Sequence, residues 1–224
     1  MIAREVTLFS IFLRITAAVI LGGSIGIERG LKNRPAGLRT YMLVCVGSCL
    51  VMLTNQYIYQ IYGTGDPVRM GAQVVSGIGF LGAGTIVVTK HSQIKGLTTA
   101  AGLWASAAVG LALGIGFYEA AIYSGAMIVT IFSVLHRLDD KMHKNSKTVE
   151  IYVELSNAIS LGMFLKQVRG LELEVDSIQL DYEGALSENG RAYIALLKAP
   201  KRVNHALIVD DISQIPGVLH LEEL

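Results

Sequence analysis

Residues 95–118 read KGLTTAAGLWASAAVGLALGIGFY, and no charged residue occurs between Lys95 and Glu119. Leu97–Gly114 has the length that a helix needs to cross roughly 30 Å of hydrocarbon. Small residues recur at every fourth position, which lets a second helix approach closely along one face. They are Thr98, Gly102, Ser106, Gly110 and Gly114. The stretch predicts a transmembrane helix in close contact with other helices.

Four more apolar stretches surround this one and predict a bundle of five transmembrane helices within residues 1–137. They are Leu8–Ile27, Tyr41–Tyr62, Gly71–Val88 and Phe117–Leu135. The whole chain of 224 residues is 52% hydrophobic and 17% charged, against about 25% charged in a soluble domain. This composition excludes a disordered chain, and two cysteines exclude a disulfide scaffold. The first stretch is expected to be a retained anchor, because further spans follow it directly.

The net charge of +1 conceals two parts of opposite charge. Residues 1–147 hold 13 Lys and Arg against 6 Asp and Glu, whereas residues 148–224 hold 6 against 12. Nineteen of the 24 glycines lie in the first part. Such a change in composition predicts a domain boundary, with a linker at 138–147 and a second domain at 148–224.

Basic residues in the short loops predict the orientation in the membrane. One side carries ten of them, and the other carries two, Arg4 and Arg69. Because basic loops stay in the cytoplasm, the N-terminus is expected outside and residues 148–224 inside. The ten are Arg29, Lys32, Arg34, Arg39, Lys90, Lys95, Arg137, Lys141, Lys144 and Lys147. A bacterial plasma membrane with a cytoplasmic C-terminal domain is the predicted location.

Further small residues extend the packing pattern to the first and fifth predicted spans. The candidate packing positions there are Gly22, Gly26, Gly30 and Gly125. Two interpretations stay open: the ladders pack helices within one chain, or one face serves a homodimer or a transmembrane helix of a partner protein.

Gly77, Gly79 and Gly82 match the pattern G-x-G-x-x-G, with Gly84 close behind. A dinucleotide site also needs a preceding strand and an acidic residue about 20 residues later, and neither occurs here. The glycines therefore predict helix packing, or a locally broken helix whose freed backbone groups line a polar cavity.

Charged and polar residues in or beside the spans are candidates for a functional site. Arg14 either extends outward to water or pairs within the bundle. Glu28, Arg29 and Arg39 form either an interfacial ion-pair network or a site for lipid headgroups, an anion or a partner. The polar pairs Arg69 with Gln73 and Asn55 with Gln56 predict a patch at the outer side.

No pattern in the sequence predicts catalysis or a bound cofactor. Carboxylates are missing from the middle of the spans, and the five histidines lack metal-ligand spacing, so no metal site is predicted. The chain is expected to be neither an enzyme nor a nucleic-acid-binding protein, and its expected surroundings are the lipid bilayer and a membrane-protein partner.

Residues 148–224 predict the order β-α-β-β-α-β of a ferredoxin-like domain. Alternating apolar residues predict strands, with a helix capped by Ser156 or Asn157 after the first. The expected strands are Thr148–Leu155, Leu173–Tyr182, Arg191–Leu197 and 216–221, and the expected second helix is Val203–Ser213. A turn is expected at Glu183–Gly190.

Three stretches together resemble the MgtC/SapB family of bacterial membrane proteins. They read GGSIGIERGLKNRPAGLRTYMLVCVGS at 22–48, RMGAQVVSGIGFLGAGTIV at 69–87 and KGLTTAAGLWASAAVGLALGIGFY at 95–118. The motif positions include Thr98 and Thr99, which join the candidate polar site. The resemblance implies an ACT-like cytoplasmic domain, a role in growth at low Mg²⁺, and modulation of other membrane proteins such as the F-type ATP synthase.

The resulting expectation is a non-enzymatic membrane protein that regulates ATP synthase or transporters in magnesium homeostasis. Two alternatives stay open: a transporter or ion pathway, and a ligand sensor whose C-terminal domain gates the membrane part.

Overall fold

The computed structural model describes residues 5–32, 34–89, 93–135, 146–181, 190–200 and 205–224. The chain forms two compact units, one of residues 1–87 and 94–136 and one of residues 88–93 and 137–224. The predicted linker, the predicted turn at Glu183–Gly190 and the expected start of the last helix at Val203 lie mostly or wholly outside the described residues.

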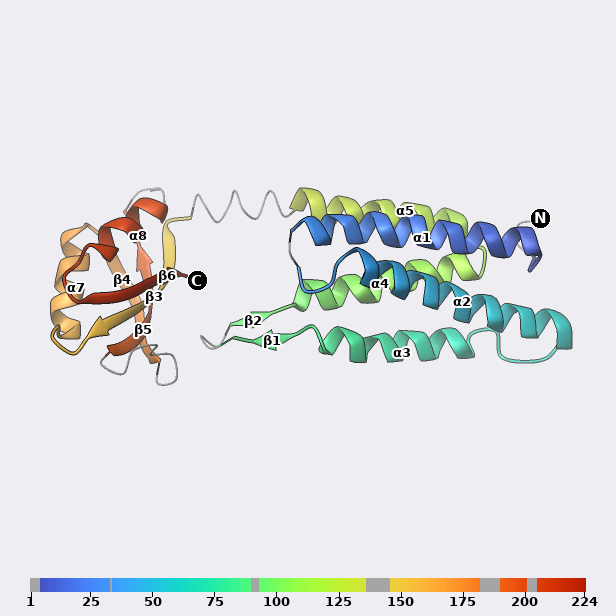
Figure 1. Cartoon of the computed structure of the whole chain (residues 1–224), viewed down its shortest axis with the longest axis horizontal. Helices are drawn as coiled ribbons and strands as arrows, with labels where there is room; N and C mark the ends of the chain where they lie inside the picture. Colours follow the sequence, from blue (N-terminus) through green and yellow to red (C-terminus); the bar gives the residue numbers. More distant parts are fainter. Residues whose placement is uncertain (1–4, 33, 90–92, 136–145, 182–189, 201–204) are drawn as a thin grey trace. The chain divides into compact units, whose positions relative to one another are not determined.

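The first unit is a bundle of helices that run side by side (Figure 1). Four helical segments of the described chain are long and apolar enough to cross a membrane. Helix α5 ends in a π-helical turn, η2, which completes the last of the four. The elements are α1 (Leu8–Leu31), α2 (Leu38–Tyr62), α3 (Arg69–Ala83), α4 (Leu97–Gly114), α5 (Tyr118–Thr130) and η2 (Ile131–Leu135).

The helix of the third predicted span, Gly71–Val88, ends earlier in the structure than predicted. Helix α3 has 15 residues, or about 22 Å, which is less than the hydrocarbon thickness. The Thr85 hydroxyl donates to the Gly82 carbonyl over 2.8 Å and so satisfies a group at the helix end. The following β-branched residues form a short hairpin, β1 (Val87–Val88) with β2 (Ile94–Lys95). The glycine pattern at 77–82 lies in continuous helix, so the helix does not break there.

Helix α2 packs against both α1 and α4 through glycines. A Cβ at Gly22 would lie 2.8 Å from Cys45 Cβ, and one at Gly26 would lie 2.7 Å from Leu38 Cα. A Cβ at Gly110 would overlap the Cys45 carbonyl oxygen. These backbones approach closely only because the side chain is absent. Both cysteines are free thiols in the core between these helices, with Ala18, Leu53, Val109, Leu113 and Ala121.

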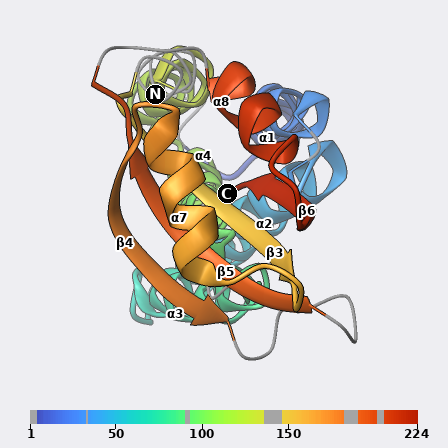
Figure 2. The ribbon, with the colours of Figure 1, turned by 90° about the vertical axis from the view of Figure 1, so that its left-hand side faces the viewer.

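The second unit has the predicted element order β-α-β-β-α-β. Its antiparallel sheet has the strand order β4-β5-β3-β6, and α7 crosses one face (Figure 2). The core on that face includes Ile151, Val153, Phe164, Val168 and Ile212. The elements are β3 (Thr148–Ser156), α7 (Leu161–Gly170), β4 (Glu174–Asp181), β5 (Gly190–Lys198), α8 (His205–Ser213) and β6 (Val218–Glu223).

The predicted cap of the first tail helix is wrong. Residues from Ser156 to Ile159 form a turn, in which the Ile159 amide donates to the Ser156 carbonyl over 3.2 Å. The N-cap of α7 is Ser160, whose hydroxyl accepts from the Met163 amide over 3.3 Å. Because of this turn, the helix begins only after Ser160, the next residue that can cap it.

Gly110→Ala is expected to destabilise the bundle, because the added methyl would overlap the backbone of α2. Overpacking of this kind costs about 1–3 kcal/mol, which an SDS titration of the protein in mixed micelles measures as the free energy of unfolding. Gly77→Ala is the matched control, since nothing lies within 4 Å of its new Cβ. Equal stability of the two variants would contradict this packing role.

Candidate functional site

A buried arginine organises one end of the bundle. Arg14 is 0% exposed, and its Nη1 donates to Gln56 Oε1 over 2.6 Å and to the Gly114 carbonyl over 2.7 Å. Its Nε donates to the Tyr118 hydroxyl over 3.1 Å. We call these four residues the Arg14 cluster. Because the guanidinium binds α2, α4 and α5 from inside, the side chain does not extend to water along the bundle surface.

A second polar cluster lies at the opposite end of the helices. Helix α1 is longer than the predicted span Leu8–Ile27. Glu28 and Arg29 therefore lie within its last turn and not beyond its end. Lys32 Nζ lies 2.5 Å from Glu28 Oε1, and it also donates to the Phe132 carbonyl over 3.2 Å. Lys32 thereby joins the end of α1 to the π-helical turn η2.

Arg29 reaches from α1 to two further elements. It is 5% exposed, its guanidinium carbon lies 4.5 Å from the Phe132 ring centroid, and its Nη2 donates to the Thr99 hydroxyl over 3.3 Å. The Tyr41 hydroxyl donates to the Thr99 carbonyl over 3.4 Å. We call the six residues Glu28, Arg29, Lys32, Tyr41, Thr99 and Phe132 the Arg29 cluster.

Gly102 provides the space in which this cluster assembles. A Cβ there would lie 2.6 Å from Phe132 Cζ and would overlap the Tyr41 hydroxyl. The two rings meet edge to face, with centroids 6.5 Å apart, a favoured geometry for aromatic pairs. A predicted packing position, Gly102, and the predicted polar residues Glu28, Arg29 and Thr99 therefore belong to one site.

The other predicted polar residues do not join either cluster. Gln73, Gly77 and Gly79 are exposed on α3, and nothing lies within 4 Å of a Cβ at either glycine. The Asn55 amide instead donates to the Pro67 carbonyl over 2.6 Å. The other exposed residues of the predicted polar site are Arg39, Arg69, Gly84 and Thr98, whereas Gly82 packs on Ala100. The residues of the predicted outer patch therefore have different neighbours and do not form one site.

The remaining predicted packing positions vary in how closely they are covered. A Cβ at Gly114 would lie 2.5 Å from the Cys49 carbonyl oxygen, and one at Gly125 would lie 3.3 Å from Leu21. Ser106 is buried and donates to the Tyr41 carbonyl over 3.3 Å. Gly30 is exposed and has only an ordinary contact, at 3.8 Å, with the Leu38 amide.

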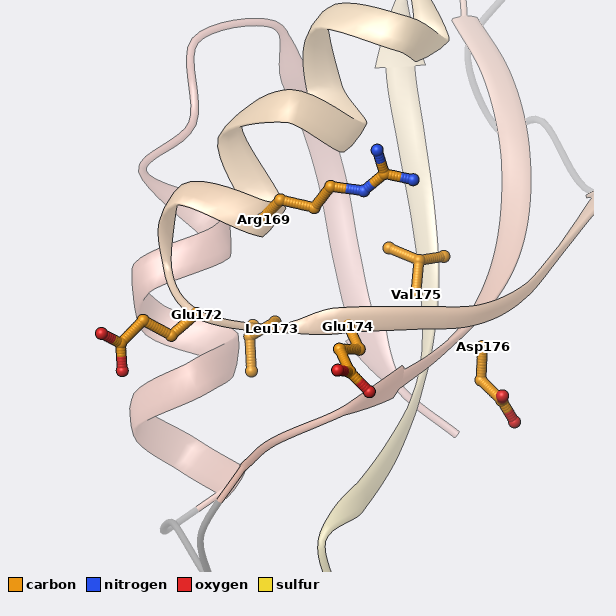
Figure 3. A pocket seen from close by; sticks show the side chains of 6 residues that line it. All are labelled: Arg169, Glu172, Leu173, Glu174, Val175 and Asp176. Carbon is orange, nitrogen blue, oxygen red and sulfur yellow. The ribbon is translucent and has the colours of Figure 1, made fainter.

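The second unit has a pocket of about 470 Å³ beside the end of α7 (Figure 3). Its acidic side chains, Glu172, Glu174 and Asp176, do not converge, and those of Glu172 and Asp176 extend in opposite directions. Within the described residues, no group of three His, Cys, Asp or Glu side chains is placed to hold a metal ion. The pocket therefore offers a cation no shared set of ligands.

Tyr152, on β3, is the titratable group of the second unit with a shifted pKa. Burial raises the pKa of Tyr152, and the carboxylates of Glu154, Asp181 and Glu222 raise it further by disfavouring the phenolate. The His220 ring packs against it with the centroids 6.1 Å apart. The hydroxyl thus stays protonated at neutral pH.

Several cluster members were absent from the predicted site. Lys32 was counted only as a loop charge, while Tyr41, Tyr118 and Phe132 were treated as apolar parts of spans. Gln56 was expected beside Gln73, but it binds Arg14. One feature of the sequence is relevant to Tyr41 and Phe132. A ladder of small residues on one helix leaves room for large side chains on the next.

Gln56→Leu is expected to lower the stability of the bundle by about 1.5–3 kcal/mol, because it removes an acceptor from a buried charged donor. The same unfolding measurement in mixed micelles tests this loss. Gln73→Leu makes the same chemical change on an exposed face and is expected to alter stability by less than about 0.5 kcal/mol. A similar effect of both variants would show that the Arg14 cluster does not hold the bundle.

Comparisons with known proteins agree with these features. The profile of the MgtC family matches residues 15–141. A relative named putative magnesium transporter YhiD, from Escherichia coli, is 36% identical over 172 residues, 75% of this chain and 79% of that protein. Protein SapB of Bacillus subtilis is 34% identical over 179 residues, 76% of this chain and 77% of its own.

Protein MgtC of Brucella abortus is 42% identical over 124 residues, 55% of this chain and 50% of its own. The family match begins within α1, one residue after Arg14, and extends through α5, so it includes the whole Arg29 cluster and the residues that bind Arg14. With four helices long and apolar enough to cross a membrane, the chain is a membrane protein that belongs to the MgtC family.

Proposed function

We propose that this protein is a non-enzymatic regulator of other membrane proteins, such as ATP synthase or transporters, in adaptation to low magnesium. It acts by contact between its α3 helix and a transmembrane helix of the partner. Family membership and the magnesium-related name of the E. coli relative support the physiological setting. The surface of α3 supports the mode of action.

The observation that carries this proposal is an exposed face of small residues on α3. Ala72, Ser76, Gly79 and Ala83 are all exposed, and their spacing places them on one side of the helix. Glycine within a helix costs up to about 1 kcal/mol relative to alanine. At Gly22, Gly26 and Gly110 a close helix contact accounts for that cost, and a partner helix would account for it at Gly79.

Neighbouring residues give the same face apolar contact area. Phe80 is 84% exposed, and Val75 on the other flank is exposed as well. Small residues let two backbones approach, and large side chains beside them supply dispersion contacts, which together drive helix association in lipid. The α3 face thus has the composition of a helix-helix interface.

We extend the proposal to the arrangement in the membrane. The N-terminus is outside, α3 completes a five-helix membrane domain, and the second unit is an ACT-like domain in the cytoplasm. The excess of basic residues in the loops at one side supports this orientation. The β-α-β-β-α-β order and the strand order β4-β5-β3-β6 support the ACT-like assignment.

Gly79→Leu is expected to abolish function, because the new side chain would hold a partner helix away from α3. The test is growth at limiting Mg²⁺ of a bacterium that lacks its own MgtC-family gene, and we expect at least a tenfold loss of yield relative to the unsubstituted protein. Gly47→Leu is the matched control, since Gly47 is an exposed helix glycine on α2 with nothing within 4 Å. Full growth with Gly79→Leu at equal membrane abundance would refute the proposed interface.

A second candidate function is magnesium transport, which the name of the E. coli relative favours. The packing of the bundle opposes it, because the buried Arg14 donates hydrogen bonds to groups of three other helices, while Gln73 and Gly79 are exposed on α3. We expect no Mg²⁺ flux above that of empty vesicles when the purified protein is placed in liposomes. Flux that Arg14→Leu abolishes and Gln73→Leu preserves would establish transport instead.

A further inference from the structure

The Arg29 cluster contains buried polar atoms that lack hydrogen-bond partners. Glu28 Oε2 and the Nε of Arg29 are buried without a hydrogen-bond partner. Glu28 Oε1 is already paired with Lys32, whose Nζ lies 2.5 Å away. The two neighbours thus hold an unused acceptor and an unused donor, and 3.9 Å separates Arg29 Nη1 from Glu28 Oε2, which is too long for a hydrogen bond.

Such unmade bonds are costly in a buried site. Each unsatisfied buried polar group costs about 1–3 kcal/mol, and more when it is charged. Arginine and carboxylate also match in geometry, since the guanidinium can donate two parallel hydrogen bonds to the two oxygens. The observed arrangement is retained because Arg29 gains other contacts, with the Phe132 ring on one side and the Thr99 hydroxyl on the other.

We propose that Arg29 is a two-position switch at this end of the bundle. In the position seen here, its guanidinium lies over Phe132 and binds Thr99. In the second position, it forms a two-bond pair with Glu28 and releases both of these contacts. Each position satisfies groups that the other leaves unsatisfied, and we therefore expect both to be populated.

The switch would act on the last turn of the membrane bundle. Phe132 lies within η2, and π-helical turns are rare and concentrate at functional sites. Its ring is held by Arg29 and its carbonyl by Lys32. Release of the ring loosens η2 and also the first turn of α4, which contains Thr99.

As a regulatory element this switch rests on the proposed function, but its existence is tested without any partner. The full chain is prepared in lipid nanodiscs with 4-fluorophenylalanine at position 132, and its ¹⁹F spectrum is recorded. Two resonances are expected, one for the ring under the guanidinium and one for the free ring. Their relative areas give the populations of the two positions.

Two substitutions should shift these populations in opposite directions. Glu28→Gln weakens the second position and is expected to raise the ratio of stacked ring to free ring at least threefold. Thr99→Val weakens the first position and is expected to lower that ratio at least threefold. Thr98→Val is the matched control, because Thr98 is the exposed neighbour of Thr99, and it should leave the ratio unchanged.

Amide hydrogen exchange gives an independent measurement. Thr99→Val should speed exchange at Ile131–Leu135 at least threefold relative to Thr98→Val, while exchange in the middle of α2 stays the same. A single resonance in all variants, or populations that shift in the same direction in Glu28→Gln and Thr99→Val, would overturn the switch. Either result would leave the α3 interface untouched, because that proposal is tested by growth of the Gly79 variant.

Discussion

The close approach of α2 to α1 and α4 is the constraint on which the rest of the membrane unit depends. Hydrophobic burial does not hold helices together in lipid, so the association relies on dispersion contacts and backbone proximity. Glycines at 22, 26, 110 and 114 let the backbones approach, and the carbonyl oxygens of Cys45 and Cys49 occupy the space that a side chain would take. The position of each polar cluster follows from this packing.

The two clusters show how a bundle with few charges places them. Arg14 is enclosed near one end by groups of α2, α4 and α5, and Arg29 is enclosed near the other by Thr99 and Phe132. Both arginines start from α1, so one helix carries the buried positive charge at both ends. A buried charge without partners would be costly, and these contacts tie α1 to its neighbours through polar bonds as well as packing.

The clusters differ in how completely their groups are satisfied. Hydrogen bonds occupy both the Nε and Nη1 of Arg14, whereas the Nε of Arg29 and the Oε2 of Glu28 lack them. A satisfied network favours one arrangement, while a partly satisfied one allows a second. The Arg14 end is therefore suited to a fixed structural role and the Arg29 end to regulation, and the α3 face provides a separate surface for a partner.

Much of the architecture follows from local sequence pattern. The limits of α4 agree with the apolar run Leu97–Gly114, and alternating apolar residues together with turn residues predict the four strands of the second unit. These features depend on the period and length of hydrophobic residues, which single segments display. The end of α3 at Ala83 was missed because Gly84, Thr85 and the β-branched residues after it are apolar enough to extend a predicted span.

The sequence by itself determined that a charge-poor membrane part with small-residue ladders precedes an acidic β-α-β-β-α-β unit. Only the tertiary structure decided which rows of small residues pack within the chain and which stay exposed, because the row on α4 faces α2 whereas Ala72, Ser76, Gly79 and Ala83 on α3 are exposed. It also decided the partners of Arg14 and Arg29. Tyr118 and Phe132 lie about a hundred residues from these arginines along the chain, and only packing brings residues so far apart in sequence into contact.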